Sequence, residues 1–107
     1  PEIRNENTAI VHVQYIDHFG QLVTNANEHW LKKWTKEKEF MAIARGRKIK
    51  NWISSREEMT ETGSLYLRIN RAGFLEIGII EPGLDGSNSA SSLLGIVIHD
   101  PIELQIK

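Results

Sequence analysis

The 107-residue sequence contains no cysteine, which excludes disulfide bonds and thiolate metal sites. It also lacks an excess of either charge, because 13 basic and 14 acidic residues leave a net charge of -1. That balance gives no whole-domain attraction to nucleic acid or to an anionic membrane. Apolar runs are only a few residues long, far short of the roughly 20 residues that span a bilayer. We therefore expect a cytoplasmic protein with neither a nucleic-acid nor a membrane partner.

Signals for metal binding and for catalysis are scarce as well. The four histidines (His12, His18, His29 and His99) stand singly, without the spacing of a metal motif, and no serine occupies a G-x-S-x-G turn. We expect no metal site and no catalytic residue in this chain. A basic cluster between residues 45 and 50, with Trp52 nearby, resembles the surfaces that hold single-stranded nucleic acid. Glutamates flank it, so a self-compensating, solvated surface is the preferred interpretation.

What the sequence does contain is a series of short segments with alternating apolar and polar residues, the pattern of β-strands. We expect strands over residues 8–16, 21–25, 39–46, 48–54, 63–70, 74–80 and 101–107, and short helices over residues 28–34 and 89–96. A turn at residues 71–73 joins two of these strands into a hairpin. Many short strands without a strand–helix–strand rhythm predict an all-β barrel or sandwich. We interpret residues 1–7 as a linker or cut end and residues 8–107 as the domain.

The stretch YIDHFGQLVTN, residues 15–25, carries more chemistry than a hairpin turn requires. Asp17, Phe19 and Gln21 have the spacing that would place a carboxylate, a ring and an amide on one side of the chain. Such a set suits a polar small molecule with a flat part. Alternatively, Asp17 caps the turn by accepting hydrogen bonds from backbone amides while Phe19 enters the core. Spacing by itself leaves both interpretations open.

Three blocks of the sequence resemble one known family. Residues 13–26 read V-Q-Y-I-D-H-F-G-Q-L-V-T-N-A, residues 70–78 read N-R-A-G-F-L-E-I-G, and residues 87–96 read S-N-S-A-S-S-L-L-G-I, followed by H-D-P-I-E-L over residues 99–104. In this order they resemble the C-terminal domain of the S-adenosylmethionine (SAM) hydroxide adenosyltransferases, or SAM hydrolases, which are relatives of the fluorinating and chlorinating enzymes. The blocks span nearly the whole chain.

The resemblance implies a closed Greek-key antiparallel β-barrel of about seven strands with one or two short helices. In the family, this barrel follows an N-terminal α/β domain, which this chain does not contain, and the α/β domain of a neighbouring subunit in a homotrimer completes the site. The implied reaction converts SAM and water to adenosine and methionine, with SAM as a substrate and no cofactor. A barrel of this kind is not catalytic without its partner domain. The alternative hypothesis is a diverged, non-catalytic oligomerisation or binding module that has lost the adenosine site.

Substrate-binding positions follow from the resemblance residue by residue. Asp17 and Phe19 match the ligand-facing carboxylate and ring of the family, and Glu76 keeps the hydrolase-type L-E-I. Three further positions depart from the family pattern: Gln21 replaces an asparagine, Arg71 replaces a serine, and Ile80 stands where the family has an asparagine beside the adenine. The resemblance predicts that these six side chains surround a nucleoside.

Overall fold

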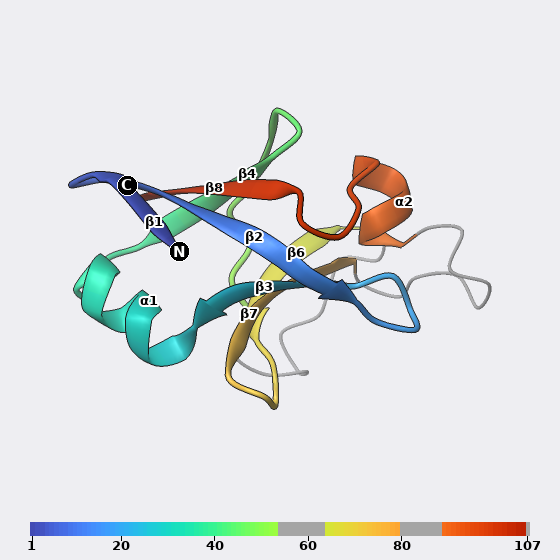
Figure 1. Ribbon diagram of the computed structural model, residues 1–107, viewed down its shortest axis with the longest axis horizontal. Helices are drawn as coiled ribbons and strands as arrows, with labels where there is room; N and C mark the ends of the chain where they lie inside the picture. The colour runs from blue at the N-terminus through green and yellow to red at the C-terminus, as the bar shows by residue number, and fades with distance from the viewer. Residues whose placement is uncertain (54–63, 80–88, 107) are drawn as a thin grey trace.

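The computed structural model describes residues 1–53, 64–79 and 89–106, and its strands wrap around one apolar interior (Figure 1). The elements in chain order are β1 (Glu2–Asn5), β2 (Thr8–Ile16), β3 (Leu22–Asn27), α1 (Glu28–Thr35), β4 (Phe40–Ala44), β5 (Arg47–Ile49), β6 (Leu65–Ile69), β7 (Phe74–Ile79), α2 (Ala90–Leu94) and β8 (Pro101–Ile106). All the pairings between these strands are antiparallel. The segment expected to be a linker or cut end contains β1, which pairs with β2.

The strands form a nearly closed barrel in the order β5-β4-β8-β2-β3-β7-β6, with β1 paired to β2 outside this path. The gap between the two end strands is bridged by the segment that follows β5. The backbone N–H of Ile53 donates to the carbonyl of Leu67 at 2.9 Å, and the N–H of Leu67 donates to the carbonyl of Asn51 at 2.9 Å. The predicted all-β barrel with short helices is confirmed.

Small and branched side chains fill the barrel because every second residue of each strand points inward. β2 shows the pattern most clearly, since Ala9, Val11 and Val13 are fully buried while the residues between them are not. The alanines of β4 are buried too, which leaves room for larger side chains from the strands opposite. The interior is formed mainly by Val11, Val13, Leu22, Leu67, Leu75, Ile77, Ile102 and Leu104.

Among the described residues, the expected elements agree with the structure to within about two residues, except in the fourth expected strand. The expected strand ends at residues 54, 63, 80 and 107 lie outside the described residues. Residues 48–54 alternate like one strand, but β5 ends at Ile49, because the backbone beyond it leaves β4 and bonds to Leu67 of β6 instead. The helix expected over residues 28–34 is α1, whose N-cap Asn27 accepts from the N–H of Trp30 at 2.8 Å. The helix expected over residues 89–96 is α2, which ends at Leu94 and is capped by Gly95 in the left-handed conformation. The loop expected over residues 82–88 lies outside the described residues.

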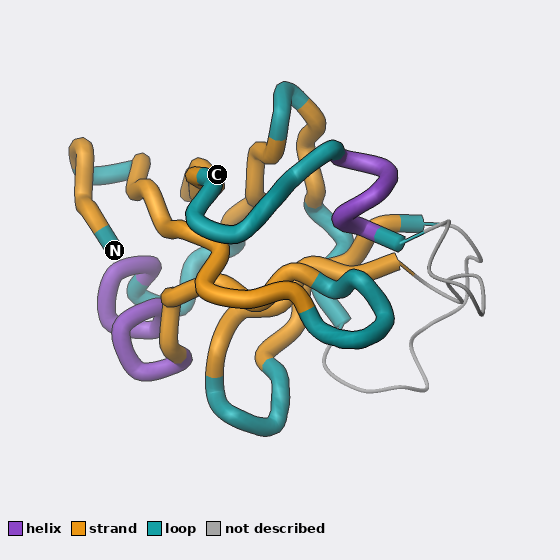
Figure 2. The backbone as a smooth tube through the Cα atoms, turned by 45° about the vertical axis from the view of Figure 1, so that its right-hand side comes forward, coloured by secondary structure: helices purple, strands orange, loops and turns teal. Residues whose placement is uncertain are grey.

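The two helices lie at opposite ends of the barrel (Figure 2). α2 sits beside the turn between β2 and β3, while α1 continues from the far end of β3. In the described parts of the chain, neither helix has the length and apolar character of a membrane-crossing segment.

Candidate functional site

The turn between β2 and β3 is held by the side chain of Asp17. Its Oδ1 accepts from the backbone N–H groups of Phe19 and Gln21, both at 2.9 Å. Two backbone hydrogen bonds close the same turn, from Asp17 N–H to the Gln21 carbonyl at 3.0 Å and from Gly20 N–H to the Asp17 carbonyl at 2.9 Å. Asp17 therefore caps the turn, as one of the two interpretations expected, and one carboxylate oxygen makes both contacts.

The N-terminus of α2 packs against this turn (Figure 2). Gly20 has φ +78° and packs directly against Ser89, so a side chain at this position would both strain the backbone and collide. The Gly20 carbonyl accepts from the N–H of Ser91 at 3.0 Å. Capping by Asp17 and docking on α2 together fix the backbone of the turn in one conformation.

Phe19 projects away from the barrel. Its side chain is 54% exposed and contacts the ring of His18 edge-on at 5.2 Å between centroids. The alternative that Phe19 enters the core is therefore wrong. An exposed ring on a rigid turn is available for stacking against a flat ligand.

Gln21 begins a chain of side-chain hydrogen bonds that runs across β7 to β6. Its Nε2 donates to the hydroxyl of Tyr66 at 2.9 Å, and that hydroxyl donates to Oε2 of Glu76 at 3.2 Å. The Nε of Arg68 lies 3.6 Å from the same carboxylate oxygen. Tyr66 and Arg68 belong to the face of β6 opposite to Leu67, so the chain of contacts lies on the outer side of the barrel.

Strand register explains why these groups meet. Tyr66 is paired with Gly78 and Arg68 with Glu76 across the β6–β7 hairpin. Gly78 has no side chain, so the Tyr66 ring lies directly over it and its hydroxyl reaches Gln21 on the other side of β7. Gly78 is thus required here for close approach, since a Cβ would collide with the ring.

Burial controls the protonation of this network. Glu76 is only 6% exposed, and burial raises the pKa of its carboxyl above the usual value, although Arg68 and the Tyr66 hydroxyl act in the opposite direction and Asp17 adds to the rise. Burial, followed by the neighbouring Glu76, also raises the pKa of the Tyr66 hydroxyl. The phenol is therefore a neutral proton donor at physiological pH.

The network also orients the amide of Gln21. An ionised Glu76 can only accept, so the single Tyr66 proton is directed to Glu76 and the Tyr66 oxygen must accept from Gln21. The NH₂ group of Gln21 therefore points toward Tyr66. Its Oε1 remains available to accept a hydrogen bond from another donor.

The six predicted substrate-binding residues do not all lie together. Asp17, Phe19 and Gln21 share the turn, and Glu76 is linked to Gln21 through Tyr66. Arg71 is exposed in the β6–β7 hairpin turn. That turn is at the other end of β7, where Gly73 accepts from the N–H of Glu28 at the start of α1. Ile80 lies outside the described residues.

Tyr66 and Arg68 were missed by sequence reasoning. The signal was present, because counting outward from the turn at residues 71–73 pairs Arg68 with Glu76 and Tyr66 with Gly78. Elsewhere in the described residues, no group of three or more His, Cys, Asp or Glu side chains could hold a metal ion. In the basic cluster, Arg45 forms an ion pair with Asp100 at 3.3 Å.

Comparison with known proteins identifies the family of this barrel. A family model described as the SAM hydroxide adenosyltransferase C-terminal domain matches residues 11–103. No curated protein matches the chain. A solved structure titled as an uncharacterized conserved protein from Thermotoga maritima is 25% identical, with a TM-score of 0.72, and the match covers 98% of this chain and 38% of that one.

A second solved structure, a conserved hypothetical protein from Thermus thermophilus, is 20% identical with a TM-score of 0.57, covering 89% of this chain and 34% of that one. At 20% identity, this similarity shows a shared fold and nothing more. The chain thus spans a little over a third of the length of these two proteins.

Proposed function

Because this chain belongs to the family of SAM hydroxide adenosyltransferase C-terminal domains, we propose that it contributes the adenosine side of a SAM-binding site. The observation that carries the proposal is the rigid turn at Asp17–Gln21, which holds an exposed Phe19 ring beside an oriented Gln21 amide. A flat base stacked on Phe19 would bring its ribose or amino-acid portion close to Gln21.

The proposed reaction converts SAM and water to adenosine and methionine. In this proposal the barrel binds and orients the nucleoside, and an N-terminal α/β domain from a neighbouring subunit of a cytoplasmic homotrimer positions the water. The described residues support a binding role because their polar groups are fixed by hydrogen bonds before a ligand arrives, which lowers the entropic cost of positioning it.

Four of the predicted residues have distinct roles in the proposal. The ring of Phe19 stacks on the base, and Oε1 of Gln21 accepts from a hydroxyl or amine of the ligand. Asp17 holds the turn with Oδ1, which leaves Oδ2 for the ligand. Glu76 is buried and acts as a positioning residue through Tyr66. Contacts of Arg71 and Ile80 with the ligand remain predictions.

Calorimetry with adenosine tests this proposal on protein that carries its N-terminal domain. We expect saturable binding that Gln21→Ala weakens by about tenfold or more, since one lost hydrogen bond in a binding site costs roughly 1–3 kcal/mol. His29→Ala is the matched control, because His29 is exposed on α1 at the other end of β3. Folded protein that shows no binding at millimolar adenosine would refute the proposal, and an unchanged affinity of Gln21→Ala would remove this turn from the site.

One observation favours the second candidate, a barrel that has lost the adenosine site and serves in oligomerisation or binding. Glu76, predicted to face the ligand, instead engages Tyr66 and Arg68, and the same network occupies one N–H of Gln21. The two candidates differ in one measurement. A protein that forms a stable oligomer by light scattering but binds neither adenosine nor SAM in calorimetry fits the second candidate only.

A further inference from the structure

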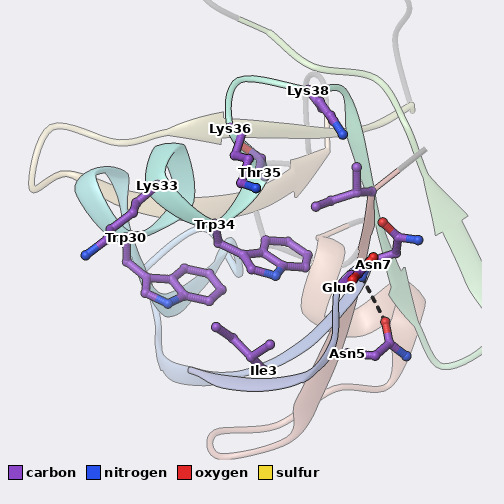
Figure 3. Close-up of a pocket in the computed structure, with 11 residues that line it drawn as sticks. Ile3, Asn5, Glu6, Asn7, Trp30, Lys33, Trp34, Thr35, Lys36 and Lys38 are labelled. Carbon is purple, nitrogen blue, oxygen red and sulfur yellow. Dashed lines mark hydrogen bonds between the residues drawn. The ribbon is translucent and has the colours of Figure 1, made fainter.

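An open groove lies at the end of the barrel opposite to the Asp17–Gln21 turn, between β1 and α1, with a volume of about 730 Å³ (Figure 3). Trp30 and Trp34, one helical turn apart on α1, form its aromatic wall. Their rings stack in parallel, with centroids 5.4 Å apart and planes inclined by 8°. Ile3 of β1 faces them from across the groove (Figure 3) and is 57% exposed. The groove is thus an aromatic surface that the described chain leaves uncovered.

A buried donor in this groove has no acceptor. The indole Nε1 of Trp34 is inaccessible to solvent, and no residue in the described ranges accepts a hydrogen bond from it. A buried N–H without a partner costs free energy. Because Nε1 has no accessible surface, a ligand in the groove would contact the apolar ring of Trp34 and not this donor.

The groove is also positively charged within a chain whose net charge is -1. Lys33, Lys36 and Lys38 line it, while Glu6 is the single carboxylate among the lining residues. The three lysines are exposed, and none of them forms an ion pair with a described residue. Three cationic groups against one anionic group give the groove a local surplus of two positive charges. Such a surface attracts an anion.

We propose that this groove binds a small flat anion of the nucleoside monophosphate class. The base would stack against the tryptophan pair, while the phosphate would meet the lysine ammonium groups. Lysine is a common phosphate ligand, and aromatic side chains accept any base on their faces. The volume of about 730 Å³ lies in the usual range of small-molecule sites, about 300–1,000 Å³.

An acidic peptide added as a strand to β1 is the competing occupant, and the structure disfavours it. β1 has four residues, and its register with β2 shifts between Ile3 and Asn5. A short edge strand with an irregular ladder is a poor template for strand addition. The groove is independent of the proposed adenosine site, since the Asp17–Gln21 turn precedes β3 and α1 follows it.

NMR of the indole N–H groups tests the proposal, because the chain has three tryptophans and Trp52 lies outside the groove, against Phe40. During titration with adenosine monophosphate (AMP), the Trp30 and Trp34 signals should shift saturably while the Trp52 signal stays in place. Affinity should fall with added salt, and AMP should bind at least about tenfold more tightly than adenosine or inorganic phosphate added separately.

Substitutions in and away from the groove test whether AMP binds there. The triple variant Lys33→Ala, Lys36→Ala, Lys38→Ala should weaken AMP binding about tenfold or more. The matched control Lys48→Ala, Lys50→Ala, which removes exposed lysines away from the groove, should not. Trp34→Phe should weaken binding, because the smaller ring keeps an aromatic wall but offers less area for stacking. Three results would overturn the proposal: no shift of Trp30 and Trp34 at millimolar AMP, equal affinity of the triple variant, or a response to poly-glutamate but not to AMP.

Discussion

Replacing Tyr66 by phenylalanine removes one hydroxyl from the centre of the buried network and leaves the ring in place. The hydroxyl accepts from Gln21 and donates to Glu76, and the residue is 1% exposed. The phenylalanine ring can still lie over Gly78, so no large cavity opens. The change therefore isolates the two hydrogen bonds from the packing of the side chain.

The two lost contacts differ in cost. Glu76 is 6% exposed and would lose its hydrogen-bond donor, which costs about 1–3 kcal/mol for a buried polar group. Gln21 is only half-buried, so its amide can turn to water and the second loss adds little. We expect the free energy of unfolding to fall by about 2 kcal/mol.

Urea denaturation followed by tryptophan fluorescence measures this effect. The midpoint should move to lower urea with an unchanged slope, since the surface exposed on unfolding is nearly the same. Tyr15→Phe is the matched control, because Tyr15 is 43% exposed and its hydroxyl has no partner among the described residues; its effect should stay within about 0.5 kcal/mol. A Tyr66→Phe variant as stable as the wild type would refute the network as a source of stability.

Three further predictions concern the same structure. Because burial raises the pKa of Glu76 above its usual value, the folded state holds this proton more tightly than the unfolded state. The free energy of unfolding should then fall as pH rises from the usual glutamate pKa through the raised one, and Glu76→Gln should lack this slope in denaturation at a series of pH values. Gly20→Ala should lower stability by at least about 1 kcal/mol, because φ is positive and Ser89 is in contact, and thermal unfolding would detect the loss. Asn27→Ala removes the N-cap of α1 and should cost about 1 kcal/mol, whereas Asn27→Ser should recover most of it; equal melting temperatures would contradict the capping role.

Local patterns predicted much of this fold because each strand carries its own alternation of buried and exposed residues. β2 is an example, since Ala9, Val11 and Val13 mark one face without reference to any other strand. β1 was not predicted as a strand because all four of its residues are exposed and no burial pattern exists to recognise. The early end of β5 also escaped prediction, because it depends on the backbone of Leu67, far away in the chain.

The candidate site was predictable only where its residues are neighbours in sequence. Asp17, Phe19 and Gln21 lie within one turn, so their spacing already placed them together. The contribution of Tyr66 depends on which residue of β7 it opposes, and this is a property of register between two strands. Arg71 shares a sequence block with Glu76, but Arg71 lies in the turn before β7, at the end of that strand away from the Asp17–Gln21 turn.

The position of β8 has a consequence for how the protein is made. This strand lies between β4 and β2, and its register joins Gln105 to Thr8 and Ile106 to Phe40. During synthesis, β2 and β4 can therefore complete their pairing only after residues 101–106 have left the ribosome. Until then two strands from earlier in the chain expose an unpaired edge, which is a template for aggregation. Completion of the barrel is thus coupled to completion of this part of the chain, and the nascent domain is most prone to mispairing just before that point.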